Sequence, residues 1–139
     1  MTKGEAAAVI LVDTSVWIAS SRGTITLADH LDIDDAVTCG PIIQEVLQGA
    51  RFERVYKVVH EAMMAMPNIE EPIHAEVYVE AANLYRTARR AGFTIRASVD
   101  CLIAACAIRH AVPLLHVDRD FDNLARVSRL QSRRLELRA

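Results

Sequence analysis

The stretch VPLLHVDRDFDNL (residues 112–124) joins an apolar run directly to three closely spaced aspartates, Asp118, Asp120 and Asp122. Its first part, 112–118, is short and apolar, as expected for a buried strand, and a helical pattern follows over about 121–130. Carboxylates crowded at a strand end repel one another unless water, a cation or a helix N-terminus takes up their charge. The end of this strand is therefore the first candidate for a functional site.

Two other segments resemble this strand. AVILVD (8–13) is apolar up to Asp13, and AVTCG (36–40) is a weaker third strand. Pro41 at a first helical position and Gly49 at a C-cap bound one of the intervening helices. The helical patterns cover 14–21, 41–49, 52–65, 74–91 and 98–110. Strands that alternate with helices predict an α/β fold with a parallel sheet covered on both faces.

Length and composition indicate one globular domain spanning residues 1–139. The chain has 139 residues, of which 52% are hydrophobic and 24% charged, enough for a single core. Its apolar runs are too short to span a membrane, and its N-terminus does not resemble a signal peptide, so we expect a cytoplasmic protein. Its three cysteines, Cys39, Cys101 and Cys106, lack metal-binding spacing and are predicted to be buried thiols.

Charge is distributed unevenly along the chain. The net charge is −2, with −8 on residues 1–85 and +6 on residues 86–139. The basic residues are almost all arginine, which binds phosphate through two parallel hydrogen bonds. The second half therefore either binds a phosphate backbone or is simply a solvated face, and the sequence leaves both readings open.

Four acidic residues are predicted to meet at one rim of the sheet. Ligand sites of parallel α/β sheets lie beyond the carboxyl ends of the strands, where Asp13 and Asp118 stand. Glu45 lies one turn into the helix after the third strand, and Asp100 lies in the first turn of the helix over 98–110, with Ser98 as its predicted N-cap. Singly, these acids could be helix caps or solvated side chains.

Together the four acids require a cation, because no lysine follows Lys57 to neutralise them. Oxygen-only ligands favour Mg²⁺ or Mn²⁺ over zinc. Such ions activate water and stabilise charge in phosphoryl displacement, so the pattern favours hydrolysis of phosphodiester bonds by a metal-activated water.

Four segments, in their order and spacing, resemble the PIN-domain family, and the chain looks most like its small VapC-type toxins. These segments are VILVDTSVWI, PIIQEVLQG, SVDCLIAACAIRH and LLHVDRDFDNLA. The resemblance implies a three-layer α/β/α sandwich with a mainly parallel central sheet. It also implies an Mg²⁺- or Mn²⁺-dependent endoribonuclease, the toxin of a VapBC-like type II toxin–antitoxin pair. Such a toxin is inhibited by a VapB-like antitoxin and is usually a homodimer.

The resemblance also assigns roles to residues. Asp13, Glu45, Asp100 and Asp118 match the family's four acidic catalytic and metal-binding positions, and Asp120 is a further ligand or holds a water. Ser15, Thr14 and His116 are supporting residues, although the family often has Thr or Ser in place of His116. Asp122 is assigned to the surface. The arginines expected to position RNA are Arg96, Arg119, Arg126, Arg129 and Arg133.

Other functions have to be weighed against this one. A phosphoacceptor receiver domain would have an acidic pair after its first strand, whereas Asp13 is followed by Thr14. The glycines form neither a dinucleotide-binding motif nor a P-loop. A catalytically inactive PIN-like module that binds RNA or a partner remains the alternative, but all four acids are present. The amphipathic segments 14–21 and 41–66 are the expected antitoxin groove.

Overall fold

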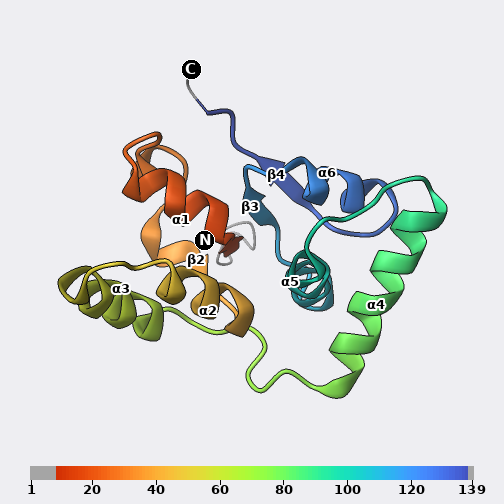
Figure 1. Ribbon diagram of the computed structural model, residues 1–139, viewed down its shortest axis with the longest axis horizontal. Helices are drawn as coiled ribbons and strands as arrows, with labels where there is room; N and C mark the ends of the chain where they lie inside the picture. Colours follow the sequence, from red (N-terminus) through yellow and green to blue (C-terminus); the bar gives the residue numbers. More distant parts are fainter. Residues whose placement is uncertain (1–8, 138–139) are drawn as a thin grey trace, which may run out of the picture.

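A parallel sheet of four strands lies at the centre of the computed structural model, which describes residues 9–137 (Figure 1). The strand order is β2-β1-β3-β4. The strands are β1 (Ile10–Val12), β2 (Ala36–Val37), β3 (Leu114–His116) and β4 (Ser132–Arg134). The helices are α1 (Thr14–Ser21), α2 (Gly40–Gln48), α3 (Glu53–Ala65), α4 (Ala75–Arg90), α5 (Ser98–Arg109) and α6 (Arg119–Arg126), with short 3₁₀ turns η2 (Leu27–Asp29) and η3 (Ile33–Asp35).

The two faces of the sheet bury different side chains, because successive residues of a strand point in opposite directions. Leu11 pairs with Leu114, and both belong to the larger core, which includes buried side chains of α2, α4, α5 and α6. Val12 pairs with Leu115, and both belong to the smaller core, beneath α1. Helices therefore cover both faces, which confirms the predicted three-layer α/β/α sandwich.

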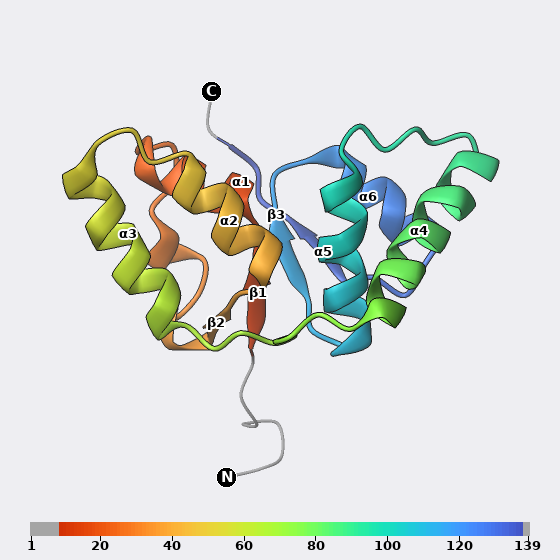
Figure 2. The same ribbon diagram turned by 60° about the horizontal axis from the view of Figure 1, so that its bottom comes forward.

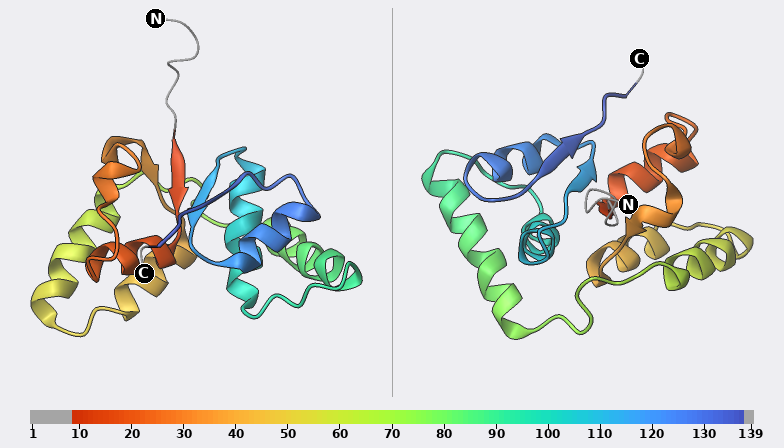
Figure 3. Two further views of the ribbon diagram at one scale, coloured as in Figure 1. Left: turned by 90° about the horizontal axis from the view of Figure 1, so that it is seen from above. Right: turned by 180° about the vertical axis from the view of Figure 1, so that it is seen from behind.

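The helices form two groups on either side of the central strands. In Figures 1 and 2, α1, α2 and α3 lie beside β1 and β2, whereas α4, α5 and α6 gather beside β3 and β4. The views in Figure 3 show the same division. The segment between α3 and α4 runs along the molecule from one group to the other (Figure 2). It follows that a site at the middle of the sheet takes side chains from both groups of helices.

The sequence located the elements well, with three corrections. The strand β4 was missed, because SRR at 132–134 has none of the apolar content of a buried strand and forms an exposed edge. The helix expected over 121–130 is α6, which begins at Arg119 directly after Asp118 and ends at Arg126. Ser98 is the first residue of α5 and not its N-cap, which is Ala97. Residue 8 of the first predicted strand lies outside the described residues.

One predicted feature of the composition is borne out in the described residues. Cys39, Cys101 and Cys106 are buried free thiols, as expected. Over residues 9–137, the structure contains no helix that is both long and apolar enough to cross a bilayer.

Candidate metal centre

Two of the predicted acids end strands and begin helices. Asp13 follows β1 and caps α1, where its Oδ2 accepts hydrogen bonds from the Ser15 backbone N–H (3.0 Å) and hydroxyl (2.5 Å). Asp118 follows β3 and caps α6, where its Oδ1 accepts from the Asp120 backbone N–H at 2.9 Å. Within residues 9–137, no such donor contacts the other oxygen of either carboxylate. Each capping acid thus keeps one oxygen for another partner.

A third acid, Asp100, approaches from the first turn of α5. Its carboxylate, with those of Asp118 and Asp120, offers oxygens that all lie within 4.8 Å of one another. Burial raises the pKa of Asp100 to about 7, and the nearby charges of Asp13, Asp118, Glu45 and Asp120 add to the effect. Burial also raises the pKa of Asp13, against the hydrogen bonds from Ser15. Negative charge is therefore costly here, and a cation among these oxygens would relieve the cost.

Hydroxyl groups next to Asp13 hold the acids in place. The Thr14 hydroxyl donates to Glu45 Oε1 at 2.9 Å, which ties the helix α2 to the end of β1. The Ser15 hydroxyl, while donating to Asp13, accepts from the Val117 backbone N–H at 3.2 Å. Ser15 therefore joins the ends of β1 and β3 and contacts Asp13 as predicted, whereas the predicted supporting residue Thr14 contacts Glu45.

His116 supports Asp118 from inside the core. Its side chain is fully buried, and its Nδ1 accepts from the Asp118 backbone N–H at 3.1 Å. Because Nδ1 is an acceptor, the proton lies on Nε2, which donates to the Ser132 hydroxyl at 2.6 Å. Burial lowers the pKa of His116, in agreement with a neutral ring. The imidazole accepts a hydrogen bond from the backbone N–H two residues ahead. A Thr or Ser hydroxyl accepts the same kind of hydrogen bond in a turn.

Arg96 is paired with the acids themselves. Its Nη2 donates to Asp118 Oδ1 at 2.9 Å, while its Nε and its backbone N–H both donate to Asp120 Oδ2 at 3.1 Å. Asp120 is buried, whereas 65% of the Arg96 side chain is exposed. Arg96 is thus part of the acidic cluster, because it is ion-paired with two of its members.

A comparison with protein families matches the PIN domain to residues 10–127, which include all of these acids. The chain belongs to the PIN-domain family. Among curated proteins, it is 38% identical to Ribonuclease VapC11 of Mycobacterium tuberculosis (strain H37Rv) over 133 residues, which cover 89% of this chain and 97% of the relative. It matches VapC ribonuclease Mb1587 of Mycobacterium bovis to the same extent. These relatives place it among the VapC-type PIN domains.

Solved structures share the fold of this PIN domain. The crystal structure of VapBC-5 from Mycobacterium tuberculosis, a member of the VapBC family of toxin–antitoxin systems, matches with a TM-score of 0.68 at 23% identity, covering 92% of this chain and 99% of that one. FitAcB from Neisseria gonorrhoeae matches with a TM-score of 0.64 at 21% identity, covering 89% and 96%. At such identities the likeness concerns the fold alone.

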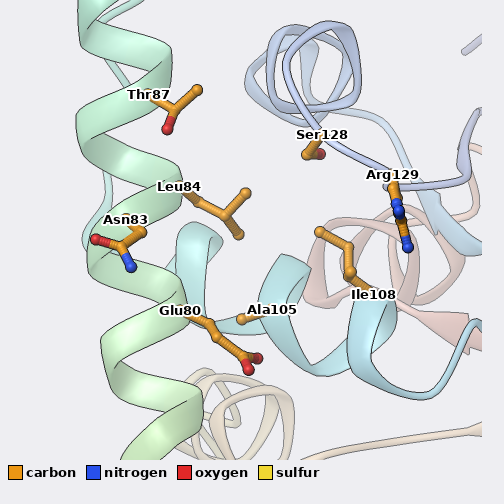
Figure 4. A pocket seen from close by; sticks show the side chains of 8 residues that line it. All are labelled: Glu80, Asn83, Leu84, Thr87, Ala105, Ile108, Ser128 and Arg129. Carbon is orange, nitrogen blue, oxygen red and sulfur yellow. The ribbon is translucent and has the colours of Figure 1, made fainter.

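The PIN-domain arginines are more scattered than the sequence suggested. Arg119 is exposed at the start of α6, beside the acids, and Arg96 is paired with them. Arg126 lies 5.8 Å from the ring centre of Phe93, and Arg133 is exposed on β4. Arg129 lines a cleft of about 250 Å³ between α4 and α5, in which Figure 4 shows Glu80 on the α4 side. None of the acidic residues of the site lines this cleft.

Asp122, which the sequence assigns to the surface, is partly exposed and has two hydrogen-bond partners. Its Oδ1 accepts from the Ser132 hydroxyl and its Oδ2 from Arg134 Nη1, both at 3.0 Å. The chain of hydrogen bonds from Asp118 through His116 and Ser132 therefore ends at an Asp122–Arg134 ion pair. Sequence reasoning missed Ser132 and Arg134, because they lie on the unforeseen strand β4 and carry no motif.

Proposed function

We propose that this PIN domain is a metal-dependent endoribonuclease and the toxin of a VapBC-like toxin–antitoxin pair. One observation carries the proposal: oxygens of the Asp100, Asp118 and Asp120 carboxylates lie within 4.8 Å of one another at the carboxyl end of the sheet, where burial, together with the charges of neighbouring acids, raises the pKa of Asp100 to about 7. The names of the VapC ribonucleases, which are 38% identical, support RNA as the substrate.

The donor set fits Mg²⁺ or Mn²⁺, because all of its atoms are carboxylate oxygens. Asp13, Asp100 and Asp118 would hold the ion, with Glu45 acting directly or through water. When bound, such an ion supplies an activated water and offsets charge on the phosphate. Ser15 and His116 fix the orientation of Asp13 and Asp118, and Thr14 orients Glu45. No side chain of this group need act as the nucleophile.

The chemistry of the products tests the proposal. Because water and not the RNA 2′-OH attacks, cleavage of total RNA with Mg²⁺ or Mn²⁺ should leave 5′-phosphate and 3′-hydroxyl ends, and EDTA should abolish it. A 2′,3′-cyclic phosphate, or cleavage that persists in EDTA, would contradict the mechanism. The alternative of an inactive binding module is not favoured, because its site would not need the acids; it predicts RNA binding without new ends.

The exposed arginines around α6 are proposed to position the RNA backbone. Arg126, Arg129 and Arg133 are all exposed. Replacing them with glutamine should flatten the plot of log affinity against log salt by up to about 2, since each phosphate contact on a single strand contributes about 0.7. An unchanged salt dependence would indicate that these arginines only form a solvated face. Binding can be measured by filter retention with an Asp100→Asn background, which prevents cleavage.

An apolar groove next to the acids is the proposed antitoxin site. It lies between α1, α2 and α3, has a volume of about 310 Å³, and is lined by Glu45 together with side chains such as Trp17, Val55, Val58 and Met63. Val58 is 67% exposed on the isolated chain. An amphipathic segment of a VapB-like protein would cover these side chains and approach the acids.

A matched pair of variants tests this groove. Val58→Asp should abolish capture of a small DNA-binding protein from native extract, whereas Val79→Asp, on a valine of α4 that is 59% exposed, should retain it. Equal capture by both variants would place the antitoxin elsewhere. We also propose a homodimer in the cytoplasm, where RNA is available, and light scattering of the purified chain tests the dimer.

A further inference from the structure

We propose that Arg96 is a built-in counter-ion of the acidic cluster, and that Asp120 anchors Arg96 instead of binding the metal ion. This inference rests on the proposed metal-dependent function. It assigns different roles to two neighbouring acids of α6 that the sequence had grouped together as metal ligands. It also removes Arg96 from the set of arginines that simply position RNA.

The hydrogen bonds of Asp120 carry the first part of the argument. Two donors of Arg96, the backbone N–H and Nε, converge on the single oxygen Oδ2 at 3.1 Å each. Because Asp120 is only 3% exposed, this contact is sheltered from water. A metal ion on the same oxygen would have to displace both donors, including one that fixes the backbone just before α5. The Oδ2 oxygen of Asp120 is thus already occupied by a partner of opposite charge, in a buried position where Arg96 holds the carboxylate through its backbone as well as its side chain.

Asp118 differs from Asp120 in exposure, because 32% of its side chain is exposed against 5% of that of Asp120. Arg96 reaches Asp118 only through its outermost nitrogen, Nη2, and contacts Oδ1, the oxygen that also caps α6. Within residues 9–137, no donor contacts Asp118 Oδ2 or the Asp100 carboxylate. An ion can therefore bind these oxygens while Arg96 stays attached to Asp120 by its inner nitrogens.

The positions of the charges give Arg96 its role. Its positive charge sits against Asp118 and Asp120 and offsets part of the repulsion among the carboxylates before a metal ion arrives. The same charge repels the arriving cation and competes with it for Asp118. Arg96 therefore lowers the affinity for the metal ion while it stabilises the metal-free fold. Asp120 keeps the arginine in this place.

Mn²⁺ binding by the full chain, measured by calorimetry and electron paramagnetic resonance, separates the two roles of Asp120. Arg96→Met should bind Mn²⁺ about tenfold more tightly than the wild type, because a competing charge is gone. Asp118→Asn, which removes a proposed ligand, should bind at least about tenfold more weakly. Arg119→Met is the matched control, since Arg119 is exposed beside the acids, and its effect should be smaller than that of Arg96→Met.

The double variant Arg96→Met/Asp120→Asn decides the question. It removes a neutral ion pair, so its Mn²⁺ affinity should lie within about threefold of the wild type if Asp120 is only an anchor. A double variant weaker by more than that would make Asp120 a ligand and overturn the inference, while leaving the proposed function intact. Failure of the wild type itself to bind Mn²⁺ would overturn both. In EDTA, Arg96→Met should also melt below the wild type, and a melting temperature at or above it would contradict the counter-ion role.

Discussion

A sheltered acidic side chain lies at each end of the helix α5, and the surroundings of the two acids are opposite in charge. At its start, Asp100 lies among other carboxylates, and burial raises its pKa to about 7. At its end, Arg109 and His110 both contact Glu70, a buried residue of the segment between α3 and α4. The hydrogen bond with His110 lowers the pKa of Glu70, in opposition to burial.

The difference separates a structural acid from a functional one. Glu70 is 6% exposed, yet the chain itself supplies its partners, with Arg109 Nε at 3.6 Å and His74 Nδ1 at 3.6 Å in addition to His110. Asp100 has no such donor in residues 9–137, and even Arg96 contacts its neighbours instead. Burial of an acid is therefore not by itself a mark of function. The mark is burial without a partner from the same chain.

The largest expected effect concerns RNA cleavage. Asp100→Asn should lower the rate by on the order of 10³-fold, because it removes a charge that the transition state requires. Glu70→Gln should leave the rate of the folded protein unchanged. Rates measured on total RNA at saturating Mg²⁺ check both values. A comparable loss of cleavage rate in the two variants would contradict the assignment of Asp100 as functional and Glu70 as structural.

The next effect concerns stability. Glu70→Gln should lower the free energy of unfolding by up to about 3 kcal/mol, because the buried carboxylate loses its charge-assisted contacts with the partly exposed Arg109 and His110 side chains. Glu76→Gln is the control: Glu76 also pairs with Arg109, at 2.9 Å, but is 61% exposed, so its loss should cost less than about 1 kcal/mol. Urea titration of both variants tests whether a buried carboxylate stabilises the C-terminal end of α5 more than an exposed carboxylate paired with the same arginine.

Metal ions should change the stability of the protein only through the acids at the start of α5. At a concentration of Mg²⁺ one hundred times its dissociation constant, the wild type should gain about 2.7 kcal/mol, because the ion binds only the folded state. Glu70→Gln should show the same gain, and Asp100→Asn a clearly smaller one. Thermal melts with Mg²⁺ and with EDTA measure these shifts. A gain that Asp100→Asn retains in full would remove Asp100 from the metal site.

Much of this arrangement was predictable from sequence, since it depends on local patterns. Apolar runs ending in Asp13 and Asp118 predicted both the strands and the rim where they end, and the pattern of α5 predicted that Asp100 faces it. The partners of these acids were not predictable. Arg96 meets Asp120 across 24 positions and His116 meets Ser132 across 16, through loops whose path no periodic pattern specifies. The same holds for Glu70, which meets His110 across 40 positions.

The smallest expected effect is the pH dependence in EDTA. The folded-state pKa of Asp100, about 7, lies above its ordinary value of 3.8, so the folded protein holds this proton more tightly than the unfolded chain. The wild type should therefore lose stability relative to Asp100→Asn as the pH rises from about 4 to about 7, by roughly 2 kcal/mol after allowance for partial exposure. Below pH 4 the difference in free energy of unfolding between the two proteins should stay constant. Urea titrations across this range test the sign, and a gain of the wild type with rising pH would contradict it.

The hydrogen bond between Ser15 and Val117 has a consequence for how the enzyme is made, because it joins residues 102 positions apart. Contacts so distant in sequence form late, after local ones such as those between the neighbouring helices α4 and α5. During synthesis the ribosome must release β3 and the residues after it before Asp13 can meet Asp118. We expect a growing chain, or one truncated before β3, to be harmless to the RNA around it, with the ability to cut arising only after β3 and α6 have left the ribosome.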